Sequence, residues 1–125
     1  MLSASANDDT IAWYENDGNQ IFSRRVIDGG FLGAQSVTTA DVDGDGDIDV
    51  LGAALGSDEI AWFENDGNEN FTRRTVTDIN GTNPADGANS VTTADIDADG
   101  DLDILSTSLI DDEVVWYENL SLIHI

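Results

Sequence analysis

One stretch of sequence occurs twice and decides the fold. Residues 36–49 read Ser36-Val-Thr-Thr-Ala-Asp-Val-Asp-Gly-Asp-Gly-Asp-Ile-Asp49, and residues 90–103 read Ser90-Val-Thr-Thr-Ala-Asp-Ile-Asp-Ala-Asp-Gly-Asp-Leu-Asp103. In each copy a run of β-branched residues leads into a segment in which aspartate stands at every second position. β-Branched residues favour strands, and Asp-Gly pairs favour tight turns. Each copy therefore predicts a strand followed by an acidic loop.

A second motif shows that the repetition extends over most of the chain. It reads Ile11-Ala-Trp-Tyr-Glu-Asn-Asp-Gly-Asn19, returns 49 positions later as Ile60-Ala-Trp-Phe-Glu-Asn-Asp-Gly-Asn68, and returns in part, 54 positions further on, as Val115-Trp-Tyr-Glu-Asn119. The residues that lengthen the second interval fall within Asn80-Gly-Thr-Asn-Pro-Ala-Asp-Gly87, where Gly, Pro and Asn indicate a loop. The chain is therefore a tandem repeat with a period of about 50 residues.

Each repeat reads as four short strands. In the complete repeat we expect them at Ser36–Ala40, Asp49–Ala54, Glu59–Asn65 and Asn70–Thr77, because β-branched and aromatic residues fill these segments and turn residues separate them. Four strands in a repeat of about 50 residues are typical of a β-propeller blade. The predicted fold class is all-β, with about two and a half four-stranded propeller blades in the chain.

These blades divide the chain into four parts. We expect a partial blade with strands 2–4 at 1–33, a complete blade with an acidic loop (41–49) at 34–83, a partial blade with strands 1–3 and a second acidic loop (95–103) at 84–119, and an atypical tail at 120–125. Open blade faces and strand edges are unfavourable in water. We therefore expect either a piece of a longer propeller or a homo-oligomer, preferably a dimer that closes a ring.

The charge is strongly one-sided. Against 26 acidic residues the chain has 4 basic ones, which gives a formal net charge of −22. Such a surface repels nucleic acid and anionic lipid and attracts cations, so we expect no nucleic-acid partner. No apolar run approaches the roughly 20 residues of a membrane span, so we expect no membrane insertion.

The acidic loops contain the candidate metal ligands. Aspartates occupy positions 1, 3, 5, 7 and 9 of each nine-residue loop, which are Asp41, Asp43, Asp45, Asp47 and Asp49 in the first and Asp95, Asp97, Asp99, Asp101 and Asp103 in the second. Calcium prefers six to eight oxygen ligands. Gly46 and Gly100 at position 6 permit the positive φ that curls such a loop. We expect about two Ca²⁺ ions per chain.

Two alternative interpretations fit these loops less well. An EF-hand needs a glutamate at position 12, where this chain has Gly52 or Ser106, and it needs flanking helices where we expect strands. The aspartates could also be ordinary solvated turn residues. Two matching frames of five carboxylates, which repel one another without a cation, are poorly explained in that way.

The pattern D-x-D-x-D-G-x-x-D between two strands of such a repeat resembles the FG-GAP (VCBS-type) repeat of integrin-α-like propellers, and the similarity runs from Leu2 to Asn119. The resemblance implies that calcium is held by side chains at positions 1, 3, 5 and 9 and by the carbonyl at position 7. It also implies an extracellular or cell-surface location and a binding or adhesion scaffold, whose protein or glycan ligand is unknown.

The repeated tryptophans allow two interpretations. Trp13, Trp62 and Trp116 share one strand position, which favours packing between neighbouring blades. Alternatively they are stacking platforms for sugar rings in a calcium-stabilised lectin, with hydrogen bonds from Glu15, Glu64, Glu118 and the adjacent asparagines.

We expect no enzymatic activity and no catalytic residues. The chain has no cysteine, and its one histidine, His124, stands next to the last residue, so no nucleophile with a base is apparent. A pair of carboxylates for glycoside hydrolysis needs two different environments, whereas here the same glutamate recurs in each repeat. Arg24, Arg25, Arg73 and Arg74 are the whole basic complement, and we expect them to offset nearby acids on an outer strand.

Overall fold

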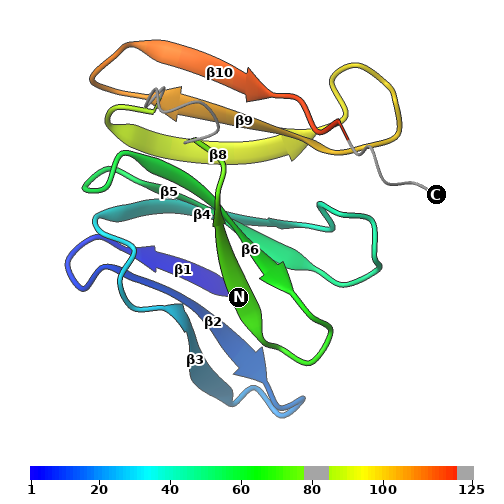
Figure 1. The fold of residues 1–125 in the computed structure, drawn as a ribbon. Coiled ribbons are helices and arrows are strands. Elements are labelled where there is room, and N and C mark those ends of the chain that lie inside the picture. The colour runs from blue at the N-terminus through cyan, green and yellow to red at the C-terminus, as the bar shows by residue number, and fades with distance from the viewer. Residues whose placement is uncertain (78–84, 121–125) are drawn as a thin grey trace.

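The computed structural model of the chain describes residues 1–77 and 85–120. The regular elements there are strands, which form three antiparallel sheets stacked one beside another (Figure 1). Blade 1 contains β1 (Leu2–Ser5), β2 (Thr10–Asn16) and β3 (Phe22–Asp28). Blade 2 contains β4 (Ala34–Ala40), β5 (Asp49–Ala54), β6 (Glu59–Asn65) and β7 (Phe71–Thr75). Blade 3 contains β8 (Ala88–Ala94), β9 (Asp103–Ser108) and β10 (Glu113–Tyr117). The all-β fold with blade-like sheets is confirmed.

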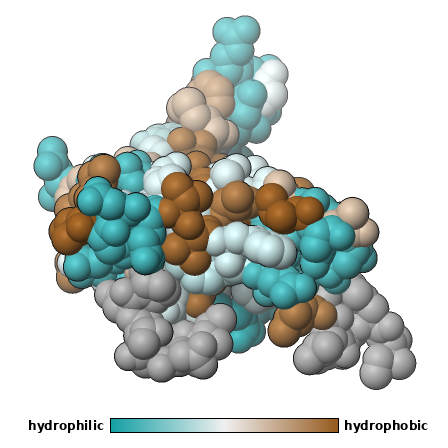
Figure 2. Space-filling model, turned by 90° about the horizontal axis from the view of Figure 1, so that it is seen from above, coloured by the Kyte–Doolittle hydropathy of each residue, from teal (hydrophilic) through white to brown (hydrophobic). Residues whose placement is uncertain are grey.

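Blade 3 forms one end of the stack. Seen from that end, the surface has hydrophobic and neutral side chains across its middle, between hydrophilic margins (Figure 2). None of the described residues forms a helix long and apolar enough to cross a bilayer.

The strand positions follow the sequence expectation with small differences. β5 and β6 have the expected bounds, whereas β4 begins two residues earlier, at Ala34, and β7 is shorter than Asn70–Thr77. The earlier start of β4 includes a bulge between Ala34 and Ser36, which blade 3 repeats between Ala88 and Ser90. The expected insertion (within 80–87) and the tail (120–125) lie largely outside the described residues.

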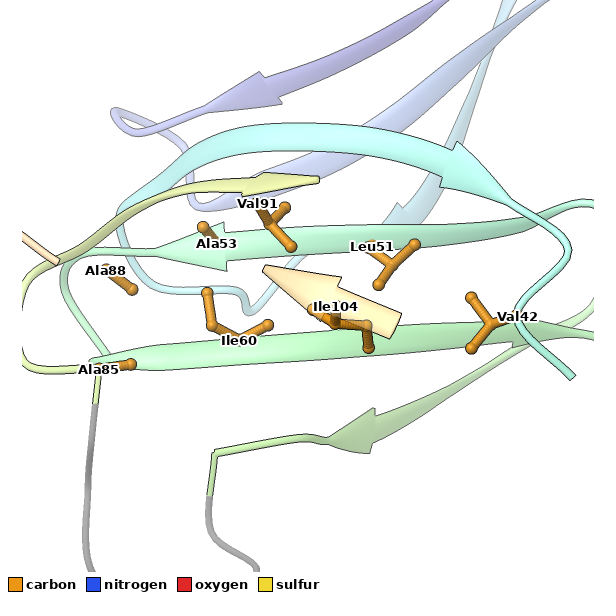
Figure 3. Close-up of a cluster of buried hydrophobic side chains, with 8 residues drawn as sticks. All are labelled: Val42, Leu51, Ala53, Ile60, Ala85, Ala88, Val91 and Ile104. Atoms are coloured by element: carbon orange, nitrogen blue, oxygen red, sulfur yellow. The ribbon is translucent and has the colours of Figure 1, made fainter. Parts of the chain in front are cut away.

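Apolar side chains fill the spaces between the blades. Between blades 2 and 3, Leu51 and Ile60 lie against Val91 and Ile104, within a buried cluster that Figure 3 shows. A second cluster, around Ile11, Phe31 and Phe63, fills the space between blades 1 and 2. Full burial of one such side chain stabilises a fold by about 1.5–3 kcal/mol. Packing between the blades therefore contributes substantially to the stability of the fold.

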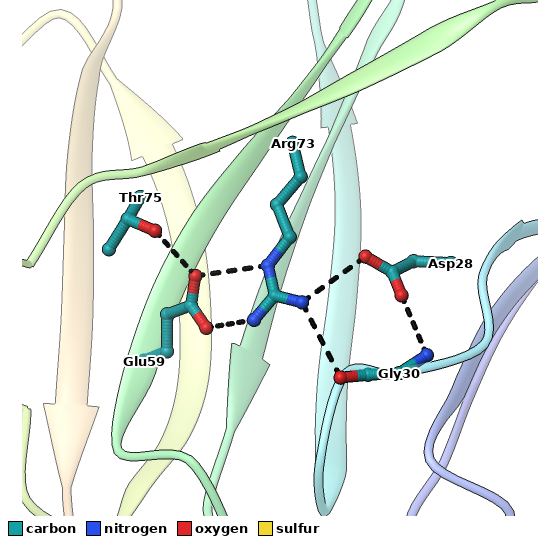
Figure 4. A network of polar contacts seen from close by, with 5 residues as sticks. All are labelled: Asp28, Gly30, Glu59, Arg73 and Thr75. Atoms are coloured by element: carbon teal, nitrogen blue, oxygen red, sulfur yellow. Dashed lines mark hydrogen bonds and ion pairs between the residues drawn. The ribbon is translucent and has the colours of Figure 1, made fainter.

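An arginine clamp joins blade 1 to blade 2 (Figure 4). Arg73 of β7 pairs with Glu59 of β6, and its Nη1 lies 3.3 Å from a carboxylate oxygen of Asp28, at the end of β3. Its guanidinium also lies 4.8 Å from the centre of the Phe31 ring. Glu59 is buried, so this pair is less screened by water than an ordinary surface ion pair.

The other three arginines also pair with acids. Arg25 pairs with Glu15 at 2.8 Å and Arg74 with Glu64 at 2.5 Å, and Arg24 lies 3.6 Å from Asp8. All four arginines stand on β3 or β7, the last strands of their sheets. The expectation that arginines offset acids on an outer strand is confirmed.

A second link recurs at both blade boundaries. The carboxylate of Asp9 accepts a hydrogen bond from the Gly33 N–H at 2.8 Å, and Asp58 accepts one from the Gly87 N–H at the same distance. Gly33 has a φ of 69°, and a Cβ there would lie 2.5 Å from the Gly56 nitrogen, so only glycine fits. In blades 1 and 2, the turn before the third strand is therefore hydrogen-bonded to the segment that begins the next blade.

Candidate metal centres

The two acidic loops occupy equivalent places in blades 2 and 3. Loop 1 (41–49) connects β4 to β5, and loop 2 (95–103) connects β8 to β9. Gly46 and Gly100 have φ values of 92° and 93°, as expected for position 6. Position 4 also has a positive φ, 75° at Gly44 and 61° at Ala98. Both loops therefore have the same curled backbone, although an alanine in loop 2 adopts a conformation that favours glycine.

The first aspartate of each loop holds the curl. The Asp41 carboxylate accepts hydrogen bonds from the N–H groups of Gly44 at 3.0 Å, Asp45 at 3.1 Å and Gly46 at 3.0 Å. Asp95 accepts the corresponding bonds from Asp99 and Gly100, both at 3.1 Å. Each loop thus wraps around its position-1 carboxylate.

Three carboxylates converge in each loop. In loop 1 they belong to Asp41, Asp43 and Asp49, and in loop 2 to Asp95, Asp97 and Asp99, with one oxygen of each residue within 4.8 Å of the others. Three oxygens at this separation are suited to a common hard cation. Positions 1 and 3 are common to both groups, while the third member is position 9 in loop 1 and position 5 in loop 2.

The remaining predicted ligands lie outside these groups. They are Asp45 and Asp47 in loop 1 and Asp101 and Asp103 in loop 2. One oxygen of Asp45 accepts a hydrogen bond from the Asp47 N–H at 2.8 Å. The structure therefore brings together six of the ten predicted residues in two groups of three.

The ninth aspartate anchors each loop to the blade. Asp49 is fully buried, and its two oxygens accept bonds from the N–H groups of Val42 at 3.1 Å and Asn65 at 2.8 Å. Asp103 is equally buried and accepts from Ile96 and Asn119, both at 2.9 Å. Position 9 thus connects the start of the loop to the end of the third strand.

Two asparagines that sequence reasoning assigned elsewhere support the loops. The Asn65 amide donates to the Ile48 carbonyl at 3.0 Å. The Asn119 amide donates to the carbonyls of Leu102 at 3.1 Å and Val42 at 3.0 Å, so it contacts loop 2 and loop 1 together. The sequence feature that could have indicated this support of the loops is the Glu-Asn pair that recurs at or just after the third strand of each blade. The lectin interpretation assigned that pair to sugar binding.

Four of the loop carboxylates have pKa values shifted from the ordinary range of aspartate. Burial, together with the nearby charges of Asp49 and Asp45, raises the pKa of Asp43 to about 6. The pKa of Asp97 is also raised, because the surrounding loop removes part of its hydration and the charge of Asp99 lies nearby. At position 9, burial raises the pKa of Asp49, whereas the backbone N–H of Asn119 lowers that of Asp103. A cation near these carboxylates would favour their charged forms.

The three tryptophans lie in different surroundings. Trp62 is half-buried against the cluster between blades 2 and 3. Trp13 is also half-buried and lines a shallow, mainly apolar groove of about 210 Å³ between blades 1 and 2. Trp116, on the end blade, is 46% exposed. Packing between blades therefore describes Trp62, whereas Trp13 borders a groove between two blades and Trp116 is exposed.

Comparison with known families agrees with this architecture. The family model for the FG-GAP-like repeat matches residues 1–52 and 41–106, and each matched segment contains loop 1. Neither the curated proteins nor the solved structures gave a significant match. The two matched segments together cover residues 1–106 of the 125-residue chain, which therefore belongs to the FG-GAP-like repeat family.

Proposed function

We propose that this chain is a calcium-binding, propeller-like scaffold in which the calcium ions are structural. The observation that carries the proposal is the convergence of three carboxylates within 4.8 Å in each of two equivalent loops. Repetition matters, because a chance cluster of acids has no reason to recur at the same place in the next blade. Oxygen-only groups of this kind suit calcium better than the softer transition metals.

The ions would bind in the loops that connect the first and second strands of blades 2 and 3. Positions 1, 3, 5 and 9, with the carbonyl of position 7, would hold one ion in each loop, giving about two ions per chain. The last aspartate of loop 1 is tied to the end of β6 through Asn65, and that of loop 2 to the segment after β10 through Asn119. Neutralising the negative charge of the loop with a bound ion would therefore stabilise the first three strands of a blade together.

The scaffold would present its surface to a protein or glycan ligand outside the cell. Extracellular calcium modules bind with dissociation constants of about 10⁻⁴ to 10⁻³ M, which suits millimolar calcium. We propose no catalytic role, since the converging acids lie in the loops and Glu15, Glu59 and Glu64 are paired with arginines.

A lectin is the second candidate, and the groove beside Trp13 favours it. Asn65 and Glu69 also line this groove, so an apolar ring and polar groups are close together. However, the Asn65 amide already donates to the Ile48 carbonyl. A glycan array separates the candidates: saturable binding that is lost in Trp13→Ala supports the lectin, and its absence leaves the scaffold.

Thermal unfolding in chelator and in calcium tests the calcium proposal. If two ions bind with dissociation constants of about 10⁻⁴ to 10⁻³ M, about 10 mM free calcium stabilises the native state by about 1.4–2.7 kcal/mol per site. The melting temperature should then rise by several degrees, and magnesium should have a smaller effect because it requires a tighter octahedral shell. Superimposable melting curves in chelator and calcium would refute the proposal.

A further inference from the structure

A continuous path of hydrogen bonds joins loop 1 to loop 2. It starts at Asp49, whose Oδ2 accepts a bond of 3.1 Å from the Val42 N–H. The Val42 carbonyl accepts a bond of 3.0 Å from the side-chain amide of Asn119. The backbone N–H of Asn119 donates in turn to Oδ1 of Asp103 at 2.9 Å. The ninth position of loop 1 is therefore connected to the ninth position of loop 2, although these aspartates belong to different blades.

The path is shielded from water along most of its length. Asp49 and Asp103 are 0% exposed, and Asn119 is half-buried. Val42 is 8% exposed and packs in the cluster between blades 2 and 3 that Figure 3 shows. Hydrogen bonds are stronger in such surroundings than in water, and a buried group that loses its partner is costly. The bonds therefore hold the two loops in a defined relation while blade 3 packs on blade 2.

Comparison with blade 2 shows which bond makes the connection. Asn65, at the position of Asn119, donates through its N–H and its amide to the ninth and eighth residues of loop 1. Asn119 makes the same two bonds to the ninth and eighth residues of loop 2. An amide nitrogen carries two hydrogens, and Asn119 uses the second for the Val42 carbonyl of loop 1. Two of these bonds support blade 3 itself, and the third reaches the loop of the preceding blade.

An ion in either loop would act on one end of this path. Asp49 belongs to the converging carboxylates of loop 1, so an ion that holds it would also fix Val42 and the carbonyl that Asn119 contacts. An ion in loop 2 that holds Asp103 would fix the Asn119 N–H in the same way. Order that the first ion has produced does not have to be produced again by the second ion. This saving in conformational entropy is a source of positive coupling.

We propose that the two calcium sites are coupled through Asn119, so that an ion in one loop raises the affinity of the other loop. This coupling rests on the proposed function, because it requires both loops to bind calcium. Coupling between two sites is reciprocal and usually amounts to about 5–150-fold in affinity. Since one side-chain bond joins the loops, we expect about fivefold, at the lower end of that range. Calcium would thereby fasten blade 3 to blade 2 as well as stabilise each loop.

Calorimetric titration with calcium measures the coupling. Asp97→Ala gives the association constant of loop 1 alone, Asp43→Ala that of loop 2 alone, and the parent chain the constant for binding both ions. The last constant divided by the product of the first two, the coupling ratio, should be about 5. The titrations are made at about 0.15 M salt, where long-range effects of the negative charge are screened.

Two further variants test the route through Asn119. In an Asn119→Ala background the same three titrations should give a coupling ratio of about 1, because the bond to the Val42 carbonyl is lost. Asn65→Ala is the matched control, since it removes the corresponding bond to the Ile48 carbonyl but leaves the path between the loops intact. Its ratio should stay at about 5. Circular dichroism must show the strand content of the parent in every variant.

The results separate the coupling from the calcium function itself. If neither loop binds calcium, both are refuted. If the parent chain binds two ions with a coupling ratio of about 1 or below, the coupling is refuted while the calcium function stands. A ratio that stays at about 5 in the Asn119→Ala background would show that Asn119 is not the connection. The ratio of the parent chain decides the coupling even if Asn119→Ala does not fold.

Discussion

Loops 1 and 2 have the same sequence frame and curled backbone but different neighbours. Loop 1 lies under blade 3, where Asn119 donates to the Val42 carbonyl, and beside the turn at Gly67, where a Cβ would come within 2.8 Å of an Asp47 oxygen. In loop 2 the converging carboxylates of Asp95, Asp97 and Asp99 are all exposed. A repeated motif therefore does not guarantee equivalent sites, because neighbouring blades set how firmly the ligands are held.

The largest expected difference between the loops is in their response to calcium. Loop 1 loses less freedom on binding, so we expect it to bind more tightly. With dissociation constants of about 10⁻⁴ M for loop 1 and 10⁻³ M for loop 2, about 10 mM calcium contributes about 2.7 and 1.4 kcal/mol, respectively. Asp43→Ala should therefore remove more of the calcium-dependent stability than Asp97→Ala, as measured by urea unfolding in calcium and in chelator.

These two variants are matched controls for each other. Asp43 and Asp97 each accept one hydrogen bond of 3.2 Å from the N–H of position 5, so truncation removes the same local contact. In chelator both variants should be close to the parent chain, because losing the bond is offset by less crowding of negative charge. Equal losses of calcium response would show that the surroundings of the loops do not set their affinity.

A smaller effect should follow from cutting the connection between the loops. Asn119→Ala removes side-chain bonds to the carbonyls of Val42 and Leu102 and should cost about 1–2 kcal/mol of stability. The substitution should also weaken calcium binding at both loops, because the Asn119 side chain contacts both of them. Calorimetric titration of the variant measures this. The control is Asn16→Ala, because Asn16 is the equivalent residue of blade 1. Among the hydrogen bonds of the described residues, its side-chain oxygen accepts a local bond from the Gly18 N–H.

If Asn119→Ala affects loop 2 alone, the bond to the Val42 carbonyl does not transmit anything to loop 1. If Asn16→Ala is equally harmful, the asparagines stabilise the turn that follows each third strand rather than the metal loops.

The smallest expected effect concerns position 4. Ala98 has a φ of 61°, so Ala98→Gly should relieve backbone strain and stabilise the chain by up to about 1 kcal/mol. Gly44 has a φ of 75° in loop 1, and Gly44→Ala should destabilise by a similar amount. Melting temperatures in chelator measure both changes. Shifts of the same sign would show that the two loops do not share the curled backbone.

Much of the fold could be predicted because the repeat constrains each strand more than once. The segments Asp49–Ala54 and Glu59–Asn65 form strands as expected, since alternating apolar residues and turn signals mark both ends. The edges of β4 and β7 were less predictable. A bulge at Gln35 extends β4 without any change in composition, and β7 stops at Thr75 although β-branched residues continue.

Features that depend on neighbouring blades could not be predicted. Trp62 and Trp116 stand at one repeat position, yet only Trp62 is covered, because blade 3 follows it. The roles of Asn65 and Asn119 were missed for a similar reason, since their carbonyl partners come from loops distant in sequence. The two loops have the same spacing of aspartates, so the sequence also did not reveal that the position-9 aspartate is one of the three converging carboxylates in loop 1 but not in loop 2.

The most direct test of the calcium account is isothermal titration of metal-free protein with calcium. The parent chain should bind about two ions, Asp43→Ala and Asp97→Ala about one each, and the double variant none. The tighter site should be the one lost in Asp43→Ala. A parent chain that shows no saturable binding at millimolar calcium, or a double variant that binds as the parent does, would contradict the central claim.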